Sequence, residues 1–527
     1  MFFVLALLPI LLSIVLLVWV KLSSRLALFF AWLSAILIAM FFWNMNVVEL
    51  SAWTTVGGLK ALDIILIIFG AILLLNTLKQ SGGMRAIEGS LMEISTDARV
   101  QALLVGWLFV SFMEGAAGFG APAALAAPLL VGAGFTPLVS VAFALICNAT
   151  ATAFGAVGTP MLTELSIAAG QVDSGAVIAL TAMIHAVVGL VVPLIGMFVL
   201  LKLQKVANFK KRFLEIIPFA LISAAAFVVP YLLLAIGFGV ELPSLVGAVI
   251  GLVVMIFIAK RGWLVPKQHL LLESAAKIKA EESDFKKMGV FKAWLPYIAI
   301  VVILVLTRLP LGGIGDWLRG VSFGWTDIFG VEGANYATSP LWSPGVWFIL
   351  VAILTVFLHG MHHKYIGKVL KNTFKQVWGA AVALVFGVAL TQIMINSGGG
   401  EVMSMVGAIA LGLSQTLGPI YLAISPVLGA LGAFVSGSNT VSNMLFTPSQ
   451  LASAINLGLP ATLILALQCV GGSFGNIVAI NNVVAASATV GLTGQEGRVV
   501  KINFVPLVVF LALIVAVGAV ASLSLTT

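Results

Sequence analysis

The sequence carries little charge for its length. Of 527 residues only 9% are Asp, Glu, Lys or Arg, whereas 61% are hydrophobic and the mean hydropathy is +1.17. Soluble domains carry about 25% charged residues because their surface must be hydrated, so this composition excludes a soluble globular protein. Apolar runs such as 2–20 and 26–43 meet the roughly 17 to 25 residues that a membrane-crossing helix needs. The sequence therefore predicts an all-α polytopic membrane protein in a lipid bilayer.

Several functional groups are also scarce. The chain has two cysteines, Cys147 and Cys469, and five histidines, which are too few and too scattered for a zinc site. It has no phosphate-binding glycine loop for ATP-driven transport, and no serine and histidine pairing that indicates a hydrolase. We therefore expect no metal, no cofactor and no enzymatic activity. The net charge of +8 does not indicate nucleic-acid binding, because the basic residues follow the membrane topology.

Ten segments are predicted to cross the membrane. Two further regions, 101–165 and 403–490, cannot be divided into individual crossings because small and polar residues interrupt them. About 12 to 14 membrane segments are expected in all. Short cytoplasmic loops are enriched in Lys and Arg, and 24 of the 27 basic residues fall on one alternating set of loops. This pattern places both termini outside the cell. The first apolar run is expected to be a membrane helix and not a cleaved signal peptide, because no basic segment precedes it. The ten predicted crossings are 2–20, 26–43, 57–78, 176–201, 214–236, 241–259, 293–308, 344–358, 377–396 and 503–523.

The crossings and loops divide the chain into six parts. The charged stretch 273–292 is expected to form a solvated cytoplasmic helix, and the Trp- and Gly-rich stretch 309–343 to lie at the outer interface. The six parts are N-terminal helices 1–56, a first repeat 57–259, a cytoplasmic loop 260–292, connecting helices 293–376 with the outer loop 309–343, a second repeat 377–502 and a C-terminal helix 503–527.

Two halves of the chain resemble each other at a nearly constant offset. By the charge pattern, Ser-Gly-Gly at 81–83 ends a helix inside the cell, whereas Ser-Gly-Gly at 397–399 ends one outside. The halves would thus be inverted repeats, which together with interrupted helices are typical of secondary transporters with a midplane substrate site. The matching stretches are 69–83 with 386–399, 112–120 with 434–442, and 144–158 with 466–478, the last pair placing the two cysteines at equivalent positions.

The interrupted segments, possible re-entrant hairpins, are the candidate binding site. FMEGAAGFGAP (112–122) places a carboxylate and three glycines in an apolar region, and SGSNTVSNM (436–444) is a row of small hydrogen-bonding side chains. Unwound backbone in a membrane is tolerated only where it is buried in protein or lines a wet cavity, and a helix N-terminus after such a break suits a carboxylate. The alternative is that these residues only allow helices to pack closely and link them. The candidate substrate-binding residues are Gly115, Gly118, Gly120, Asn148, Ser436, Ser438, Asn439, Thr440 and Asn443.

Three ionisable residues in predicted helices are candidates for proton coupling, because each costs at least roughly 2.5 kcal/mol at the bilayer centre. Glu114 is the only carboxylate that the predicted topology forces deep into the membrane, and a carboxyl that is hard to ionise there suits proton uptake and release. Asp63 shares a helix face with Lys60, so mutual neutralisation stays open as an alternative. Two roles stay open for His185, a proton relay or a hydrogen-bonded structural histidine. Two further glutamates are expected in outer loops: Glu164 and Glu401.

Long stretches of the sequence resemble the bacterial L-lactate permease family. They are FMEGAAGFGAPAALAAPLLVGAGFTPLVSVAFALICNATATAFGAVGTP (112–160), GAFVSGSNTVSNMLF (432–446) and the run into GLTGQEGRVVK (491–501). The resemblance spans nearly the whole chain. It implies a symporter of the bacterial inner membrane that takes up L-lactate, and often D-lactate or glycolate, together with protons. A monocarboxylate would occupy the anion site and Glu114 would carry the proton.

A more distant similarity concerns Ser-Asn-Thr at 438–440. Divalent anion/sodium symporters, which are elevator-type transporters, carry such triplets at paired hairpin tips that hold carboxylate and sodium. The first repeat has AAGFG (116–120) where a second triplet would stand, which disfavours sodium coupling. Sodium-coupled carboxylate uptake, an anion channel and, third, a membrane enzyme stay as alternatives to proton symport. Because elevator-type transporters are often dimeric, the resemblance is compatible with a homodimer.

Overall fold

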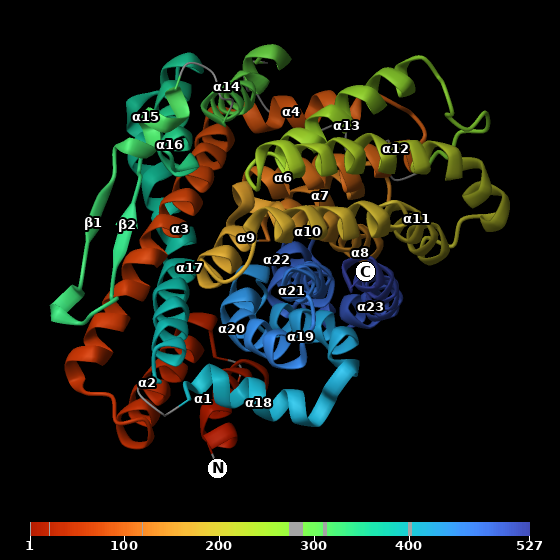
Figure 1. Ribbon diagram of the computed structural model, residues 1–527. Coiled ribbons are helices and arrows are strands. Elements are labelled where there is room, and N and C mark those ends of the chain that lie inside the picture. The colour runs from red at the N-terminus through yellow and green to blue at the C-terminus, as the bar shows by residue number, and fades with distance from the viewer. Residues whose placement is uncertain are drawn as a thin grey trace.

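The computed structural model describes residues 2–20, 22–118, 120–272, 288–308, 313–398 and 403–526. Within these residues the chain is almost entirely helical, with one two-stranded antiparallel sheet at its edge (Figure 1). Ten of the described helical stretches are long and apolar enough to cross a membrane, and five shorter apolar helices accompany them. The predicted all-α polytopic fold is thus confirmed. Lys21, Glu401 and most of the charged stretch 273–292 lie outside the described residues.

The predicted crossings coincide with helices but understate two of them. The crossing predicted at 57–78 is part of α3 (Val47–Ser81), and the one at 377–396 is part of α17 (Ile366–Ile395). A capping box fixes the start of α3, because Asn46 accepts a hydrogen bond from the Glu49 N–H and the Glu49 carboxylate accepts one from the Asn46 N–H. Hydropathy detects only the apolar part of such a helix, so its polar first turns are missed.

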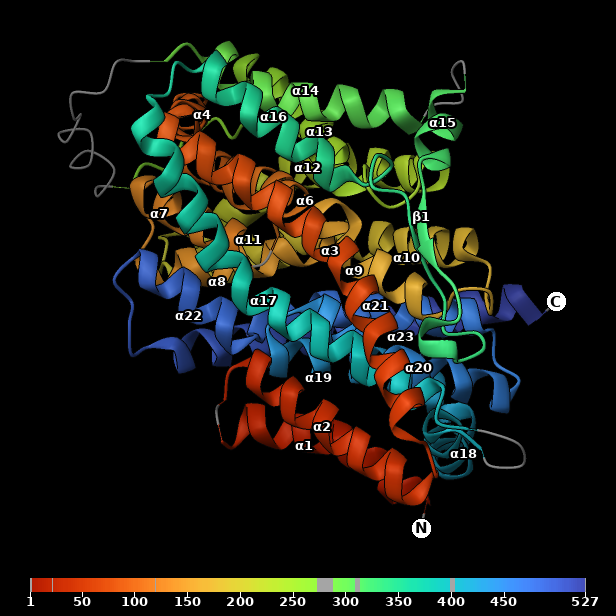
Figure 2. The ribbon, with the colours of Figure 1, turned by 90° about the vertical axis from the view of Figure 1, so that its left-hand side faces the viewer.

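The long helices α3 and α17 pack against each other, with α2 packed against α17 and α16 against α3 (Figure 2). Their approach is close because glycines stand at the crossings. A Cβ on Gly57 would lie 2.4 Å from the Cα of Ala389, and one on Gly345 of α16 would lie 2.5 Å from the carbonyl of Leu66. Small residues at such crossings let helix backbones touch in a membrane. The other elements of this group are α1 (Phe2–Val18), α2 (Ser24–Phe42), α16 (Pro344–Leu358) and the 3₁₀ turn η6 (His363–Tyr365).

The predicted outer segment 309–343 contains a short helix and the β-hairpin. The hairpin runs beside α3 (Figure 1) and is tied to it at Asp63, whose carboxylate accepts hydrogen bonds from the Tyr336 hydroxyl at 3.0 Å and the Thr338 hydroxyl at 2.6 Å. The strands pair antiparallel, with Gly324 opposite Ala337. The elements here are α14 (Val290–Arg308), α15 (Ile314–Gly320), β1 (Phe323–Trp325), η5 (Ile328–Gly330) and β2 (Tyr336–Thr338).

The first region that resisted division, 101–165, is a helical hairpin followed by a broken helix. Asp97 caps the start of the hairpin and holds the buried guanidinium of Arg99 at 2.7 Å, and Arg99 also pairs with Glu215 at 3.0 Å. This buried ion-pair cluster fixes the entry of the hairpin. The elements are α4 (Gly83–Met92), α5 (Ala98–Leu103), the π-helical turn η1 (Leu104–Phe109), α6 (Val110–Ala116), α7 (Ala121–Gly132), α8 (Pro137–Asn148), the 3₁₀ turn η2 (Ala149–Phe154) and α9 (Gly155–Ile167).

The second undivided region, 403–490, has the same order of elements. A helical hairpin is again followed by a helix that a 3₁₀ turn interrupts, as the internal duplication predicts. The elements are α18 (Met405–Leu417), η7 (Gly418–Ile420), α19 (Tyr421–Ser436), α20 (Asn439–Leu457), α21 (Ala461–Gly475), the 3₁₀ turn η8 (Asn476–Val478) and α22 (Ile480–Thr489).

The two halves pack against each other reciprocally. The second arm of the first hairpin, α7, packs against α22, the last part of the second broken helix, and the second arm of the second hairpin, α20, packs against α9, the last part of the first. In Figure 2, α7 and α22 lie toward the left and α9 and α20 toward the right, so the hairpins approach from opposite sides. The structure does not support equivalent cysteines, because Cys147 precedes its 3₁₀ turn at Ala149 by two residues and Cys469 precedes its turn at Asn476 by seven.

The remaining helices cover this core. The crossing predicted at 176–201 is divided in two near Leu190, just before Pro193. In Figure 2 both chain ends lie toward the right, while the α1–α2 link, α4 and the link after α22 lie toward the left. Both termini thus share one side, and which side faces the cytoplasm stays a prediction. The covering helices are α10 (Ser174–Gly189), α11 (Val192–Leu203), α12 (Phe209–Phe238), α13 (Pro243–Lys260) and α23 (Glu496–Thr526).

Candidate functional site

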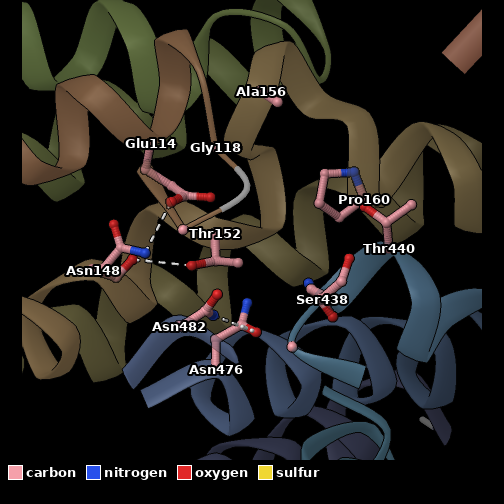
Figure 3. A pocket seen from close by; sticks show the side chains of 14 residues that line it. Glu114, Gly118, Asn148, Thr152, Ala156, Pro160, Ser438, Thr440, Asn476 and Asn482 are labelled. Carbon is pink, nitrogen blue, oxygen red and sulfur yellow. Dashed lines mark hydrogen bonds between the residues drawn. The ribbon is translucent and has the colours of Figure 1, made fainter. Parts of the chain in front are cut away.

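The interruptions of the two hairpins and the two broken helices meet in one cavity. Figure 3 shows residues of the first half, among them Glu114 and Asn148, facing residues of the second half, among them Ser438 and Asn482. The space between the lining atoms is about 350 Å³, including the part open to solvent. The lining residues are Glu114, Gly118, Gly120, Asn148, Thr152, Gly155, Ala156, Pro160, Gly437, Ser438, Asn439, Thr440, Asn476 and Asn482.

Four helices begin at this cavity. Gly120 immediately precedes α7, Ser438 and Asn439 start α20, and Asn482 lies in the first turn of α22. The right-handed part of α9 follows Gly158, and Pro160 in its first turn lines the cavity. The first N–H groups of a helix have no partner within the helix, and its dipole is positive at that end. The cavity therefore offers donors and positive potential from both halves, and none of the described residues that line it is cationic.

Local backbone geometry explains why the chain breaks at these points. Gly120 has φ +78° and Gly437 has φ +76°, the left-handed region that favours glycine. Three successive residues from Ala156 to Gly158 also have positive φ, which is costly for Ala156 and Val157. Strain of this kind persists only where the surroundings enforce it, and it concentrates at functional sites.

Glu114 sits in a close pocket within the cavity. Its Oε2 accepts a hydrogen bond from the Asn148 side-chain amide at 2.9 Å, and the residue is 5% exposed. A Cβ built on Gly155 would lie 2.4 Å from Glu114 Oε1, and one on Gly118 would lie 3.5 Å from the same oxygen. These glycines leave the space that the carboxyl occupies.

The cavity also presents amide and hydroxyl groups. The Oδ1 atoms of Asn148 and Asn439 are buried without a hydrogen-bond partner among the described residues. Thr152 donates to the Asn148 carbonyl at 3.1 Å, and Asn482 donates to Asn476 Oδ1 at 3.4 Å (Figure 3). Buried acceptors without partners are rare in folded proteins, so Asn148 is suited to a ligand that donates a hydrogen bond. The Asn439 amide is instead turned toward α21, where it donates to the Cys469 carbonyl and the Ser473 hydroxyl.

Most of the predicted site residues come together here, and three do not. Gly115 lies inside α6 and packs on α13, where a Cβ would be 2.4 Å from the Leu245 nitrogen, so it serves close helix packing. Asn443 is fully buried and donates to the Pro160 carbonyl at 3.0 Å, linking α20 to α9. Ser436 faces a different cavity and donates to the Gly432 carbonyl at 2.7 Å. The predicted residues that line the central cavity are Glu114, Gly118, Gly120, Asn148, Ser438, Asn439 and Thr440.

The other two candidates for proton coupling lie away from the cavity. The carboxylate of Asp63 accepts hydrogen bonds from the β-hairpin, and within the described residues it forms no ion pair with Lys60. The alternative of mutual neutralisation is thus not supported by an ion pair. His185 is fully buried and stacked on Phe474 at a centroid distance of 5.7 Å, and neither ring nitrogen has a hydrogen-bond partner among the described residues. It is therefore a packed histidine, and the expected hydrogen bond is not formed.

Sequence reasoning missed half of the lining. Apart from Gly437 at the tip of the second hairpin, the missed residues belong to the broken helices, where the prediction considered only Asn148. The signal was present as NATATAF (148–154) and NIVAINN (476–482), small and amide-bearing stretches inside apolar helices at matching places in the two halves. The missed residues are Thr152, Gly155, Ala156, Pro160, Gly437, Asn476 and Asn482.

Glu164 is a second buried carboxyl, and the expectation that it lies in an outer loop is wrong. It is on α9 with 0% exposure, and its Oε1 is 3.5 Å from the Thr447 hydroxyl of α20. The hydropathy pattern failed because α9 continues past Pro160 as part of a nearly fully buried stretch. Glu114 is thus not the only carboxylate deep in the protein.

A second, larger cavity adjoins the first at the tip of the second hairpin. Ser438 and Thr440 line both cavities. The second cavity, about 840 Å³ including the part open to solvent, is bounded by Arg25 at the start of α2, by α17 and by Asn481 of α22. It lies on the side of the molecule with the basic loops. The Ser436 carbonyl at the tip accepts hydrogen bonds from Ser24 at 3.2 Å and Asn481 at 3.1 Å.

The chain matches known proteins along its whole length. A family model described as L-lactate permease matches residues 2–526. The putative L-lactate permease of Haemophilus influenzae is 32% identical over 500 residues, covering 90% of each chain. The L-lactate permease of Bacillus subtilis is 30% identical over 466 residues, covering 82% of this chain and 79% of that one. Among solved structures, the YdaH transporter of Alcanivorax borkumensis is similar with a TM-score of 0.46 and 14% identity, over 88% of this chain and 86% of that one. The chain belongs to the L-lactate permease family.

Proposed function

We propose that this protein imports L-lactate and related 2-hydroxymonocarboxylates, including D-lactate and glycolate, by symport with protons across the bacterial inner membrane. The observation that carries the proposal is the single cavity that four helix N-termini and the carboxyl of Glu114 share. Membership of the L-lactate permease family supports lactate as the substrate. The basic loops support an inside location for the side with the second cavity.

The substrate carboxylate binds at the start of α20. There Ser438, Asn439 and Thr440 line the cavity, and a helix N-terminus is a ready anion site. The Ser438 hydroxyl also caps the helix, because it accepts a hydrogen bond from the Val441 N–H at 3.4 Å. The 2-hydroxyl group of the substrate donates to the side-chain oxygen of Asn148, which lacks a hydrogen-bond partner among the described residues. A monocarboxylate without the hydroxyl would leave this acceptor unpaired, which is costly in a closed site.

Glu114 couples the proton to the anion because both occupy the same cavity. Two like unit charges about 4 Å apart repel by about 4 kcal/mol at an effective dielectric constant of about 20. The lactate anion therefore binds well only when Glu114 is protonated, and loss of that proton on the inside expels the anion. Proton and anion enter together and leave together.

The tip of the second hairpin is the barrier on the inner side. Ser438 and Thr440 line both the central cavity and the second cavity. Among the described residues, two side-chain hydrogen bonds, from Ser24 and Asn481, hold the Ser436 carbonyl at the tip. Movement of this tip would join the two cavities and release the substrate toward the basic side. A transporter needs such a gate, and an open channel does not.

The test is uptake of radiolabelled L-lactate into proteoliposomes with an inside-alkaline pH gradient. Symport predicts accumulation of at least about tenfold per pH unit, loss of accumulation with a protonophore, and no change when choline replaces sodium. Glu114→Gln is expected to lower the accumulation by about tenfold per pH unit, whereas Glu332→Gln, an exposed matched control, should leave it unchanged. Equilibration without accumulation would indicate a channel, and dependence on sodium would indicate sodium symport.

A further inference from the structure

Glu164 is buried between the two halves of the protein with incomplete hydrogen bonding. It is fully buried on α9, its Oε1 is 3.5 Å from the Thr447 hydroxyl, and its Oε2 has no hydrogen-bond partner among the described residues. The thiol of Cys469 on α21 lies beside the carboxyl. A purely structural acid would be expected to have both oxygens satisfied.

No cation compensates this carboxyl within the described residues. α20 has no titratable side chain and α21 has only Cys469, and Glu164 takes part in no ion pair there. An unpaired carboxylate inside a membrane protein costs several kcal/mol, so Glu164 holds a proton in this conformation. The titratable residues on the other helices packed against α9 are Glu114 on α6, Lys260 on α13, and Glu49, Lys60, Asp63 and Lys79 on α3, and none of them makes a hydrogen bond or ion pair with Glu164 within the described residues.

The carboxyl is connected to the central cavity through Cys469. The sulfur of Cys469 lies 3.6 Å from the side-chain nitrogen of Asn439 and 3.5 Å from that of Asn443. Because both amides donate to the sulfur, the thiol hydrogen is free to point at Glu164. Asn439 lines the cavity, and Asn443 holds the carbonyl of Pro160, which also lines it. Rearrangement of Asn439 around a bound anion is thus passed to the surroundings of Glu164.

We propose that Glu164 is a second proton-carrying group of the transport cycle, so that two protons cross with each carboxylate anion. The inference rests on the proposed proton symport. One proton binds Glu114 in the cavity and one binds Glu164 at the contact between α9 and α20, and both are released on the inner side. Two protons and one anion carry one net positive charge inward per cycle, so transport is electrogenic.

The experiment uses the full-length protein in liposomes at equal pH on both sides, with a potassium diffusion potential set by valinomycin. At an inside-negative potential of about 60 mV, one net positive charge per cycle predicts about tenfold accumulation of L-lactate. Glu164→Gln, which keeps the shape of the neutral acid but holds no exchangeable proton, should abolish this response. The same variant should keep about tenfold accumulation per unit of pH gradient, whereas the wild type at zero potential should reach about a hundredfold.

Two control variants separate a proton carrier from a packing role. Glu164→Asp keeps the acid and should restore the response to potential, and Thr447→Val removes the contacting hydroxyl but should leave the response in place. A wild type that accumulates lactate with a pH gradient but ignores the potential would overturn the second proton and leave the proposed symport standing. An unchanged response in Glu164→Gln would overturn it equally. If the wild type accumulates lactate in response to neither the pH gradient nor the membrane potential, the proposed function itself would be overturned.

Discussion

Replacing Gly155 by Ala perturbs the Glu114 carboxyl although no polar side chain is replaced. The backbone of Gly155 has φ −66° and ψ 159°, which alanine adopts freely, so the substitution adds no backbone strain. Its new methyl group, however, would lie 2.4 Å from Glu114 Oε1 and 3.1 Å from Cδ. Since contacting carbon and oxygen atoms need well over 3 Å, the carboxyl has to move by roughly 1 Å.

The size of the effect follows from what surrounds the carboxyl. A shift of that size away from Gly155 breaks or lengthens the 2.9 Å hydrogen bond from Asn148. A buried hydrogen bond left unmade costs about 1–3 kcal/mol, and forcing an extra methyl into a packed site costs about 1–3 kcal/mol. If either cost falls on the transport-competent state, the rate of lactate uptake drops by about tenfold to a hundredfold.

The assay is the initial rate of pH-driven L-lactate uptake in proteoliposomes with matched amounts of protein. Gly58→Ala is the control, because a Cβ there meets nothing within 4 Å, and it should transport like the wild type. Shortening the acid should relieve the clash, so Gly155→Ala combined with Glu114→Asp should lose less activity than the two single effects multiplied together. Normal uptake by Gly155→Ala, or fully multiplicative losses in the double variant, would refute the role assigned to this pocket.

Three further predictions concern residues outside the central cavity. In efflux from lactate-loaded vesicles, Arg25→Gln should raise the KM for lactate by about threefold at low ionic strength and by much less at high salt, because Arg25 lines the second cavity and attracts the anion. His185→Phe should keep the wild-type pH profile of uptake and an equal or higher Tm, because both ring nitrogens of His185 are buried without partners in the described chain; a changed pH profile would show a proton relay. Burial raises the pKa of Glu88 to about 7, against a smaller opposing effect of Lys79 and Arg85, and Glu88 is on α4 outside the candidate membrane spans. Because its pKa is higher in the folded than in the unfolded state, Tm should fall as pH rises from about 4.5 through 7, and Glu88→Gln should remove that slope.

The membrane crossings could be predicted because hydropathy alone decides them. The apolar stretches 26–43 and 503–523 coincide with helices α2 and α23. Helix ends could not be placed in the same way, because they depend on caps and on polar turns beyond the bilayer, as at Asn46 and Glu49 before the apolar part of α3. The broken regions could be located but not divided, because glycine, asparagine and proline interrupt a helix and also occur within intact ones.

The central cavity shows why residue type alone does not assign a role. Gly115 and Gly155 are both glycines of the same repeat, yet the first meets the backbone of Leu245 and the second meets the carboxyl of Glu114. Asn443, inside α20, ties two helices, whereas Asn439, four residues earlier, starts the helix and lines the cavity. In each pair the difference is which atoms from a distant part of the chain lie opposite, and that contact forms only when the two halves pack. The duplicated order of elements is the one sequence feature that carries this information, because it requires the four interruptions to meet in one place.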